Sequence, residues 1–471
     1  MSKKRRLRWS ILLALSGCTV HLWAQDVPKQ KLDAIYQSAV ADYSAGKYAD
    51  AAHRLEAVLP FATKSFEVHE LLGLIYASMS ENAKALDQLK LAVQLKPDSA
   101  AGRTNLGAIL LQSGNADLAG EQFRKALELE PTSYDANHDL GEFYIQSGRV
   151  ADALPLLKTA YGAEPNAYDN GYDLAMADFL LGQLDEARQI VERLLREKNS
   201  GELHNLLAQI DEKQDRFVDA ANEYAAAAHL DPTEENLFDW GSEALLHATY
   251  DPAIAIFQAA VARYPNSARL QIGLGLSLYS RDKYDDAVKA LLSAVALTPG
   301  DPRCYYFLSK AYDSSPNRAD EVIQAFRRYA ESEPQNALAQ YYYAVSLWKG
   351  RRSQASSPEL QQVESLLRKA IALNDRLPEA HLQLGDLYAD QHAYEKSIPE
   401  YQRALALNSE LSDAHYRLGT DYVHVGQKDK AQQEFAAYQK LRSEHLAEVD
   451  KQRADVKQFV YSAKSPDSGK Q

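Results

Sequence analysis

The chain has 471 residues, a formal net charge of −13 and only two cysteines, Cys18 and Cys304. This length exceeds what one ordinary core supports, so several domains or an array of repeats are expected. The acidic balance argues against nucleic-acid binding, which needs clustered lysine and arginine to neutralise phosphate. No structural disulfide is expected once an N-terminal leader has been removed.

Residues 1–24 join five basic residues to an apolar run, the pattern of a secretory leader. Two export signals overlap in it. The stretch from Leu15 to Cys18 resembles a bacterial lipobox, in which Cys18 would be lipidated and would anchor the chain to a membrane. The stretch from Leu22 to Gln25 favours an ordinary signal-peptidase cut after Ala24. The fuller apolar core favours the second cut, so we expect a signal peptide over 1–24 and an exported periplasmic protein. A membrane-anchored lipoprotein is the alternative.

From about Leu32 onward the chain repeats itself at an offset of about 34 residues. Each copy carries a small residue at its eighth position, a turn residue near its fifteenth, alanine at its twentieth and, in most copies, a proline near its end. The eighth positions are Gly73, Gly107, Gly141, Ala175, Ala208, Gly241, Gly275, Ser309, Ala344, Gly385 and Gly419. Small residues at these positions allow two antiparallel helices to pack closely.

This pattern resembles the tetratricopeptide repeat (TPR). The resemblance implies an all-α, right-handed superhelical solenoid of about twelve helical hairpins, with a concave and a convex surface. Glycine near position 15 is expected to end the first helix of a hairpin, and stacked neighbours bury what one hairpin leaves exposed.

The organisation expected along the chain has four parts after the leader. An N-terminal TPR array covers 32–300, and a C-terminal TPR array covers 301–441. The second array carries a basic, serine-rich insertion at 349–363, which we expect to be an exposed loop, either merely tolerated or used as a contact or bend. A C-terminal helix over 442–462 and a disordered tail over 463–471 complete the chain.

The search for catalytic or metal-binding motifs assigns no residue. His69 and Glu70 begin an HExxH motif, but Gly73 occupies the place of the second histidine. Histidines at repeat position 4 (His69, His204, His381, His415) are interpreted as packing residues. Cys304 is interpreted as a passive thiol, because no histidine or acidic partner is evident beside it. We therefore expect no catalytic, cofactor-binding or metal-binding residue, and no enzyme.

The TPR resemblance places ligand contacts at positions 2, 5, 9, 12 and 13 of the first helices. The apolar and aromatic candidates at these positions are Tyr172, Met176, Phe179, Phe238, Leu245, Ile272, Tyr279, Tyr306, Tyr341 and Trp348. The acidic candidates are Glu67, Glu70, Asp135, Glu142, Glu202 and Glu212. For each aromatic residue the alternative is packing between repeats. The lysine and asparagine clamp by which some TPR domains hold a terminal carboxylate is absent, so a basic or aromatic-rich segment is the favoured ligand.

The leading hypothesis is a non-catalytic scaffold or assembly factor of the bacterial cell envelope that holds an extended peptide or a partner protein in the concave groove. The alternative is a glycan-binding or polysaccharide-export accessory protein, and a third hypothesis is a subunit of an enzyme complex. No cofactor is expected, contact with a membrane would be only through the lipid anchor, and the oligomeric state is left open.

Overall fold

The computed structural model describes residues 29–314, 317–351 and 357–443, together with Ala454 and Lys457. The expected signal peptide, Cys18, the C-terminal helix beyond residue 443 and the tail over 463–471 lie outside these residues. The described part contains 24 α-helices, one short 3₁₀ helix (η1, Leu59–Phe61) and no strand. The prediction of an all-α fold of about twelve hairpins is confirmed.

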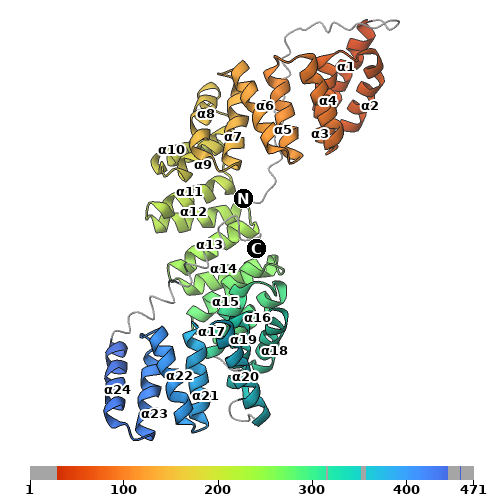
Figure 1. Cartoon of the computed structure of the whole chain (residues 1–471). Helices are drawn as coiled ribbons and strands as arrows, with labels where there is room; N and C mark the ends of the chain where they lie inside the picture. The colour runs from red at the N-terminus through yellow and green to blue at the C-terminus, as the bar shows by residue number, and fades with distance from the viewer. Residues whose placement is uncertain (1–28, 315–316, 352–356, 444–453, 455–456, 458–471) are drawn as a thin grey trace. The chain divides into compact units, whose positions relative to one another are not determined.

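Each hairpin consists of an odd-numbered first helix and an even-numbered second helix, as Figure 1 shows. The first helices are α1 (Lys29–Ser44), α3 (Phe66–Ser78), α5 (Ala100–Gln112), α7 (Tyr134–Gln146), α9 (Tyr168–Leu180), α11 (Gly201–Lys213), α13 (Glu234–Leu246), α15 (Ala268–Ser280), α17 (Pro302–Ser314), α19 (Ala337–Arg351), α21 (Pro378–Asp390) and α23 (Ser412–His424). The second helices are α2 (Tyr48–Val58), α4 (Asn82–Leu95), α6 (Ala116–Leu129), α8 (Val150–Ala163), α10 (Leu184–Glu197), α12 (Phe217–Leu230), α14 (Tyr250–Arg263), α16 (Tyr284–Leu297), α18 (Ala319–Ser332), α20 (Ser357–Leu373), α22 (Tyr394–Leu407) and α24 (Lys428–Ser443).

The two helices of a hairpin approach closely because a glycine at position 8 faces a large side chain at position 24. A methyl group added at these glycines would lie 2.6–2.8 Å from that side chain, too close for van der Waals contact. The pairs are Gly73 with Leu89, Gly107 with Phe123, Gly141 with Leu157, Gly241 with Phe257, Gly275 with Leu291, Gly385 with Tyr401 and Gly419 with Phe435. The repeat pattern thus encodes a complementary pair, of which the sequence analysis recognised only the small partner.

Position 15 ends the first helix in the left-handed backbone region. The five glycines there have φ between 73° and 80°, as the sequence analysis expected (Gly46, Gly114, Gly148, Gly182, Gly426). Five other residues adopt φ between 56° and 63° at the same position (Ser80, Asp215, Ala248, Asp282, His392). Among these Ala248 has no polar side chain to compensate a conformation that costs L-residues roughly 1–2 kcal/mol.

Polar side chains fix the start of the first helix and its contact with the second. In five hairpins a serine or threonine oxygen before the helix accepts a backbone N–H of its first turn (Ser65, Ser99, Ser200, Thr233, Ser267). The position-4 histidines form hydrogen bonds with position 23 of the second helix: His69 with Gln88 and His381 with Glu400, both at 2.7 Å, His204 with Glu223, and His415 with Glu434. Their interpretation as structural residues agrees with these contacts.

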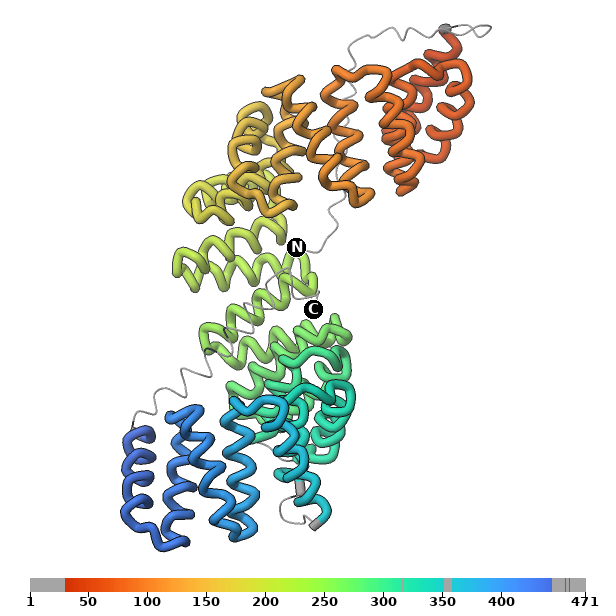
Figure 2. The backbone as a smooth tube through the Cα atoms, in the orientation of Figure 1, coloured from red at the N-terminus to blue at the C-terminus, as the bar shows by residue number. Residues whose placement is uncertain are grey.

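The chain divides into two compact units, residues 1–223 and 224–471. In each unit one hairpin follows the next along the chain (Figure 2). The boundary expected after residue 300 falls inside the second unit, because α16 packs on α17 and one apolar core continues from Ala228 to Tyr342.

The expected insertion at 349–363 is largely helical where the structure describes it. Residues 349–351 belong to the end of α19, and 357–363 form the beginning of α20, so the loop expected there is shorter than predicted. Pro358 and Glu359 explain the early start of α20. Proline has no backbone N–H that would need a partner in the first turn, and the negative charge of Glu359 interacts favourably with the positive end of the helix dipole. Residues 352–356 lie outside the described residues.

Candidate functional site

Within each unit, most consecutive first helices lie against one another. Consecutive first helices contact each other in the pairs α1–α3, α3–α5, α5–α7, α7–α9 and α9–α11, and in α13–α15, α15–α17, α17–α19 and α21–α23. Among the described second helices a comparable contact is found at α16–α18. First helices therefore lie closer together than second helices, as expected for the inner side of a curved stack. We call this surface the first-helix face.

In the unit 1–223, three apolar candidates lie together on α9. Tyr172, Met176 and Phe179 are spaced by four and three residues, so they share one side of the helix. All three are half-buried and pack against the core formed by Val191, Leu206 and their neighbours. Each therefore contacts the core and keeps exposed area on the first-helix face.

In the unit 224–471, three tyrosines have the same character. Tyr279, Tyr306 and Tyr341 are half-buried and lie against the large core of that unit. Each has an aromatic neighbour: Tyr279 has Tyr284 at 5.5 Å between ring centroids, Tyr306 has Phe307 at 5.1 Å, and Tyr341 has Tyr342 at 5.5 Å. Rings held on one side by other rings lose little conformational freedom when a ligand covers the remaining side.

Four other candidates belong to the core. Phe238, Leu245, Ile272 and Trp348 are 0%, 3%, 1% and 6% exposed. Phe238 packs edge-on against Phe257, with ring centroids 6.1 Å apart. Side chains with so little exposed area offer a ligand almost nothing to contact. These four residues therefore pack between helices, which was the alternative considered for each of them.

The six acidic candidates all retain exposed area. Glu67, Glu70, Asp135, Glu142 and Glu212 are half-buried, and Glu202 is exposed. They lie on α3, α7 and α11, which are all first helices of the unit 1–223. Negative charge is therefore concentrated on the first-helix face of that unit.

The pKa of the Glu70 carboxyl is strongly raised. Burial raises its pKa to about 7, a hydrogen bond from Asn105 Nδ2 at 3.1 Å counteracts the rise, and the charge of Glu67 adds to it. Because the native state holds the proton more tightly than an unfolded chain does, this group makes the fold less stable as the pH rises from about 4.5 to about 7.

Replacing Glu70 with glutamine is expected to raise the free energy of unfolding at pH 8 by about 1–2 kcal/mol and to leave it unchanged at pH 4. The amount is smaller than the full pKa shift implies, because the side chain is partly exposed. Urea unfolding at the two pH values measures the difference. Glu202→Gln is the control, since Glu202 is exposed. An equal increase in the free energy of unfolding of both variants at pH 8 would contradict the interpretation that burial of the Glu70 carboxylate destabilises the fold.

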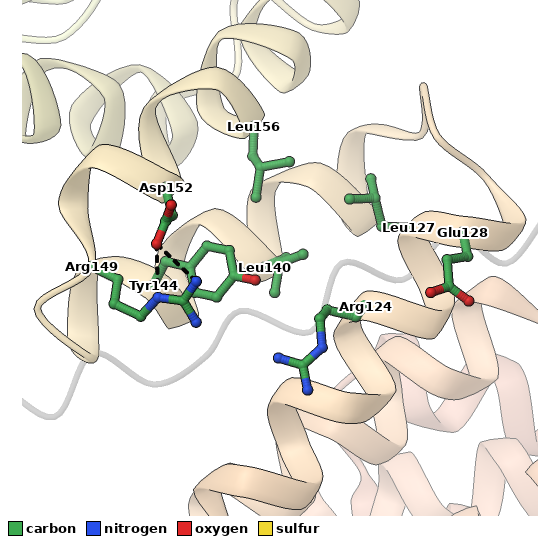
Figure 3. A pocket seen from close by; sticks show the side chains of 8 residues that line it. All are labelled: Arg124, Leu127, Glu128, Leu140, Tyr144, Arg149, Asp152 and Leu156. Carbon is green, nitrogen blue, oxygen red and sulfur yellow. Dashed lines mark hydrogen bonds and ion pairs between the residues drawn. The ribbon is translucent and has the colours of Figure 1, made fainter.

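A shallow depression of about 320 Å³ lies where α6, α7 and α8 meet (Figure 3). Its lining includes Leu127, Leu140 and Leu156, with charged side chains around them. Arg149 lies 4.2 Å from the ring centroid of Tyr144 and donates to Asp152 at 2.8 Å. The depression is at the lower limit of small-molecule sites, and none of the predicted groove residues lines it.

Models of the tetratricopeptide repeat match residues 36–100, 110–156, 146–210, 238–302 and 378–411, which together make up more than half of the chain. These matches agree with the hairpins, with the small residues at position 8 and with the left-handed turns. The chain belongs to the tetratricopeptide-repeat family.

Similar proteins include two peroxisomal targeting signal receptors. That of Eremothecium gossypii is 32% identical over 77 residues and that of Saccharomyces cerevisiae 34% identical over 77 residues, in each case 16% of this TPR chain. The matches span 13% and 12% of the two receptors.

Among solved structures, PilW, described as a type IV pilus biogenesis factor, is 24% identical with a TM-score of 0.41, covering 44% of this chain and 96% of its own. Yeast Tom70 is 15% identical with a TM-score of 0.35, covering 92% and 97%.

Polar side chains of consecutive repeats contact each other in a way that was not predicted from the sequence. Position 5 of one repeat meets position 6 of the next repeat across the first-helix face, 35 residues along the chain. Glu70 meets Asn105 in this way, and His138 meets Asp173 with Nε2 and Oδ2 3.2 Å apart. The sequence signal that could have predicted these contacts is a pair of polar residues separated by 35 positions.

The remaining chemical candidates are structural in this TPR fold. His69 Nε2 lies 3.1 Å from the carbonyl oxygen of Thr63 and Nδ1 lies against Gln88, so both ring nitrogens have protein partners. Cys304 is fully buried, and burial raises the pKa of its thiol to about 11, which agrees with a passive thiol. Within the described residues, no helix is both long and apolar enough to span a membrane.

Proposed function

We propose that this TPR protein is a non-catalytic scaffold of the bacterial cell envelope that holds an extended segment of a partner protein along its first-helix face. The observation that carries the proposal is the presence of half-buried rings on the first-helix face of each unit, each anchored by the core of its own unit: Tyr172 and Phe179 in the unit 1–223, and Tyr279, Tyr306 and Tyr341 in the unit 224–471. Anchored aromatic side chains bury a large area at low entropic cost, which is typical of peptide-binding surfaces.

The acidic residues indicate the charge that the ligand should carry. Carboxylates on α3, α7 and α11 favour a segment that carries lysine or arginine, and they disfavour an acidic one. Glycan binding, the alternative, loses its best stacking platform because Trp348 is buried. We therefore favour a basic and aromatic peptide segment as the ligand.

The envelope location rests on the sequence of residues 1–24. The basic start and the apolar run to Ala24 support export with cleavage after Ala24, and lipidation at Cys18 remains the alternative. The mass of the mature chain from a bacterial host distinguishes the two cleavage sites, because a lipidated chain would begin at Cys18 and the other chain at Gln25. Labelling with palmitate gives a second test: a lipidated wild type would take up the label, and the Cys18→Ser variant would not.

The binding function is tested by photo-crosslinking in the envelope. A crosslinking residue at Phe179 captures the partner, which is identified by mass, and the affinity of the purified partner is then measured. We expect Tyr306→Ala/Tyr341→Ala to weaken binding at least tenfold, since each ring would lose its contact with the ligand. Glu67→Gln/Glu70→Gln should weaken it less and should reduce its salt dependence.

Leu118→Ala is the matched control, because Leu118 is half exposed and lies on the second helix α6. It should bind as the wild type does. Unchanged affinity in both groove variants would overturn the assignment of the first-helix face. Failure to crosslink any specific protein in intact envelopes would overturn the scaffold function itself.

A further inference from the structure

Three side chains of metal-ligating type converge between two consecutive TPR repeats. His138 and Glu142 lie one turn apart on α7, and Asp173 lies on α9. One ligand atom from each lies within 4.8 Å of the others. Within the part of the chain that the structure describes, this is the one such group of three or more histidine, cysteine or acidic residues. The sequence alone predicted no metal site at these residues.

The imidazole of His138 is held as metal-bound histidines usually are. Its Nδ1 lies 3.3 Å from Asp139 Oδ1, so the carboxylate accepts the Nδ1 proton and Nε2 points to Asp173. Tyr134, one turn earlier, stacks on the ring at 5.4 Å with an interplanar angle of 10°. A metal-bound histidine usually donates its second ring N–H to a carboxylate, a backbone carbonyl or water, which fixes the tautomer and the orientation of the ring, and Asp139 supplies such a partner here.

The charges around the cluster favour a cation. The carboxylates of Asp139 and Asp173 lie 3.3 Å and 3.2 Å from the two ring nitrogens of His138, and Glu142 adds a third negative group nearby, so the cluster attracts a cation. His138 is nearly buried and Asp173 is 7% exposed, so water screens this attraction weakly.

We propose that a divalent transition-metal ion of the Zn²⁺ type binds His138 Nε2 together with the carboxylates of Glu142 and Asp173, joining α7 to α9. The ion replaces the proton between His138 and Asp173, which leaves to solvent. A tetrahedral ion with bonds of about 2.0–2.2 Å separates its donors by roughly 3.4 Å, close to the observed 3.2 Å between Nε2 and Oδ2. Imidazole nitrogen favours zinc and its neighbours over Mg²⁺ and Ca²⁺, which prefer oxygen.

The same positions in other repeats lack this donor set. The repeat of α3 has Glu70 and Leu74, facing Asn105, and the repeat of α11 has Asn205 and Gln209. The ligand set is therefore a property of one junction between repeats rather than of the TPR pattern. Three protein ligands leave a fourth position for water or for a donor of a bound partner.

The test is metal binding by the intact mature chain. Equilibrium dialysis with Zn²⁺, with Mg²⁺ and Ca²⁺ as comparison ions, should show one Zn²⁺ site that neither comparison ion occupies. His138→Gln, Glu142→Gln and Asp173→Asn should each weaken Zn²⁺ binding at least tenfold. Hydrogen exchange should show that Zn²⁺ protects α7 and α9 in the wild type and not in the variants.

His204→Gln is the matched control. His204 also lies on a first helix with an acidic partner, Glu223, but no third ligand joins them among the described residues. It should bind Zn²⁺ as the wild type does. Circular dichroism verifies that every variant is folded, so weak binding is not mistaken for unfolding. The proposal would be overturned if the wild type did not bind Zn²⁺, or if the three cluster variants bound Zn²⁺ as tightly as the wild type does. His138 and Asp173 would then be a plain ion pair.

Discussion

Replacing Phe238 with alanine is expected to lower the free energy of unfolding of the unit 224–471 by about 3–5 kcal/mol. Phe238 is fully buried, packs on Phe257 and lies 5.0 Å from the guanidinium of Arg269. The ring of Phe257 already occupies the space left by Gly241 and Gly273, so it cannot move into the cavity without losing contacts of its own. Urea unfolding, followed together with hydrogen exchange of α13 to α16, measures the loss.

The comparison variant is Tyr306→Ala at the same repeat position. Tyr306 is half-buried, so its removal should cost about 1 kcal/mol while it weakens partner binding. Equal losses of stability for the two variants would mean that the distinction between core and groove residues is wrong. A stability loss for Phe238→Ala below about 1 kcal/mol would show that the surrounding side chains collapse into the cavity.

Replacing Arg188 with methionine is expected to lower the stability of the unit 1–223 by about 2–4 kcal/mol. Arg188 on α10 pairs with Asp211 on α11, and its Nη2 also donates to Gln214 at 2.7 Å. The side chains of Arg188 and Asp211 are 13% and 2% exposed, so the variant leaves a buried carboxylate. Arg216, 3.3 Å from Asp211, compensates part of the loss.

Two further variants test this explanation by thermal and urea unfolding. Arg196→Met, on an exposed side of the same helix, should change the free energy of unfolding by less than about 0.5 kcal/mol. Arg188→Met/Asp211→Leu should recover most of the loss, because no unpaired carboxylate remains. A double variant as unstable as the single one would show that arginine packing, rather than its charge, stabilises the junction.

The hairpins were predictable because their determinants are local and recur. Gly107 at position 8 and Gly114 at position 15 each satisfy a requirement inside one repeat, and the period of about 34 residues repeats that requirement. The insertion at 349–363 was predicted less well. Its basic, serine-rich composition indicated a loop, while the start signal at Pro358 extended α20 into it.

Exposure within the groove was not predictable from the register. Phe238 and Tyr306 both occupy position 5, but Phe238 is fully buried and Tyr306 only half-buried, because burial depends on which side chains the neighbouring repeats present. The cluster of His138, Glu142 and Asp173 was missed for a similar reason. Its two parts lie 35 residues apart, and only the packing of α7 on α9 brings them together.

The pairing of position 8 with position 24 lies within one repeat, whereas position 5 meets position 6 of the following repeat. A lineage that gained or lost a whole repeat would therefore inherit each hairpin with its internal packing intact and would renew only the junctions. Loss of residues 168–200, for instance, would bring Leu206 into the register of Asp173 and leave His138 without that carboxylate. The length of the array and the chemistry of its junctions can thus evolve under separate constraints.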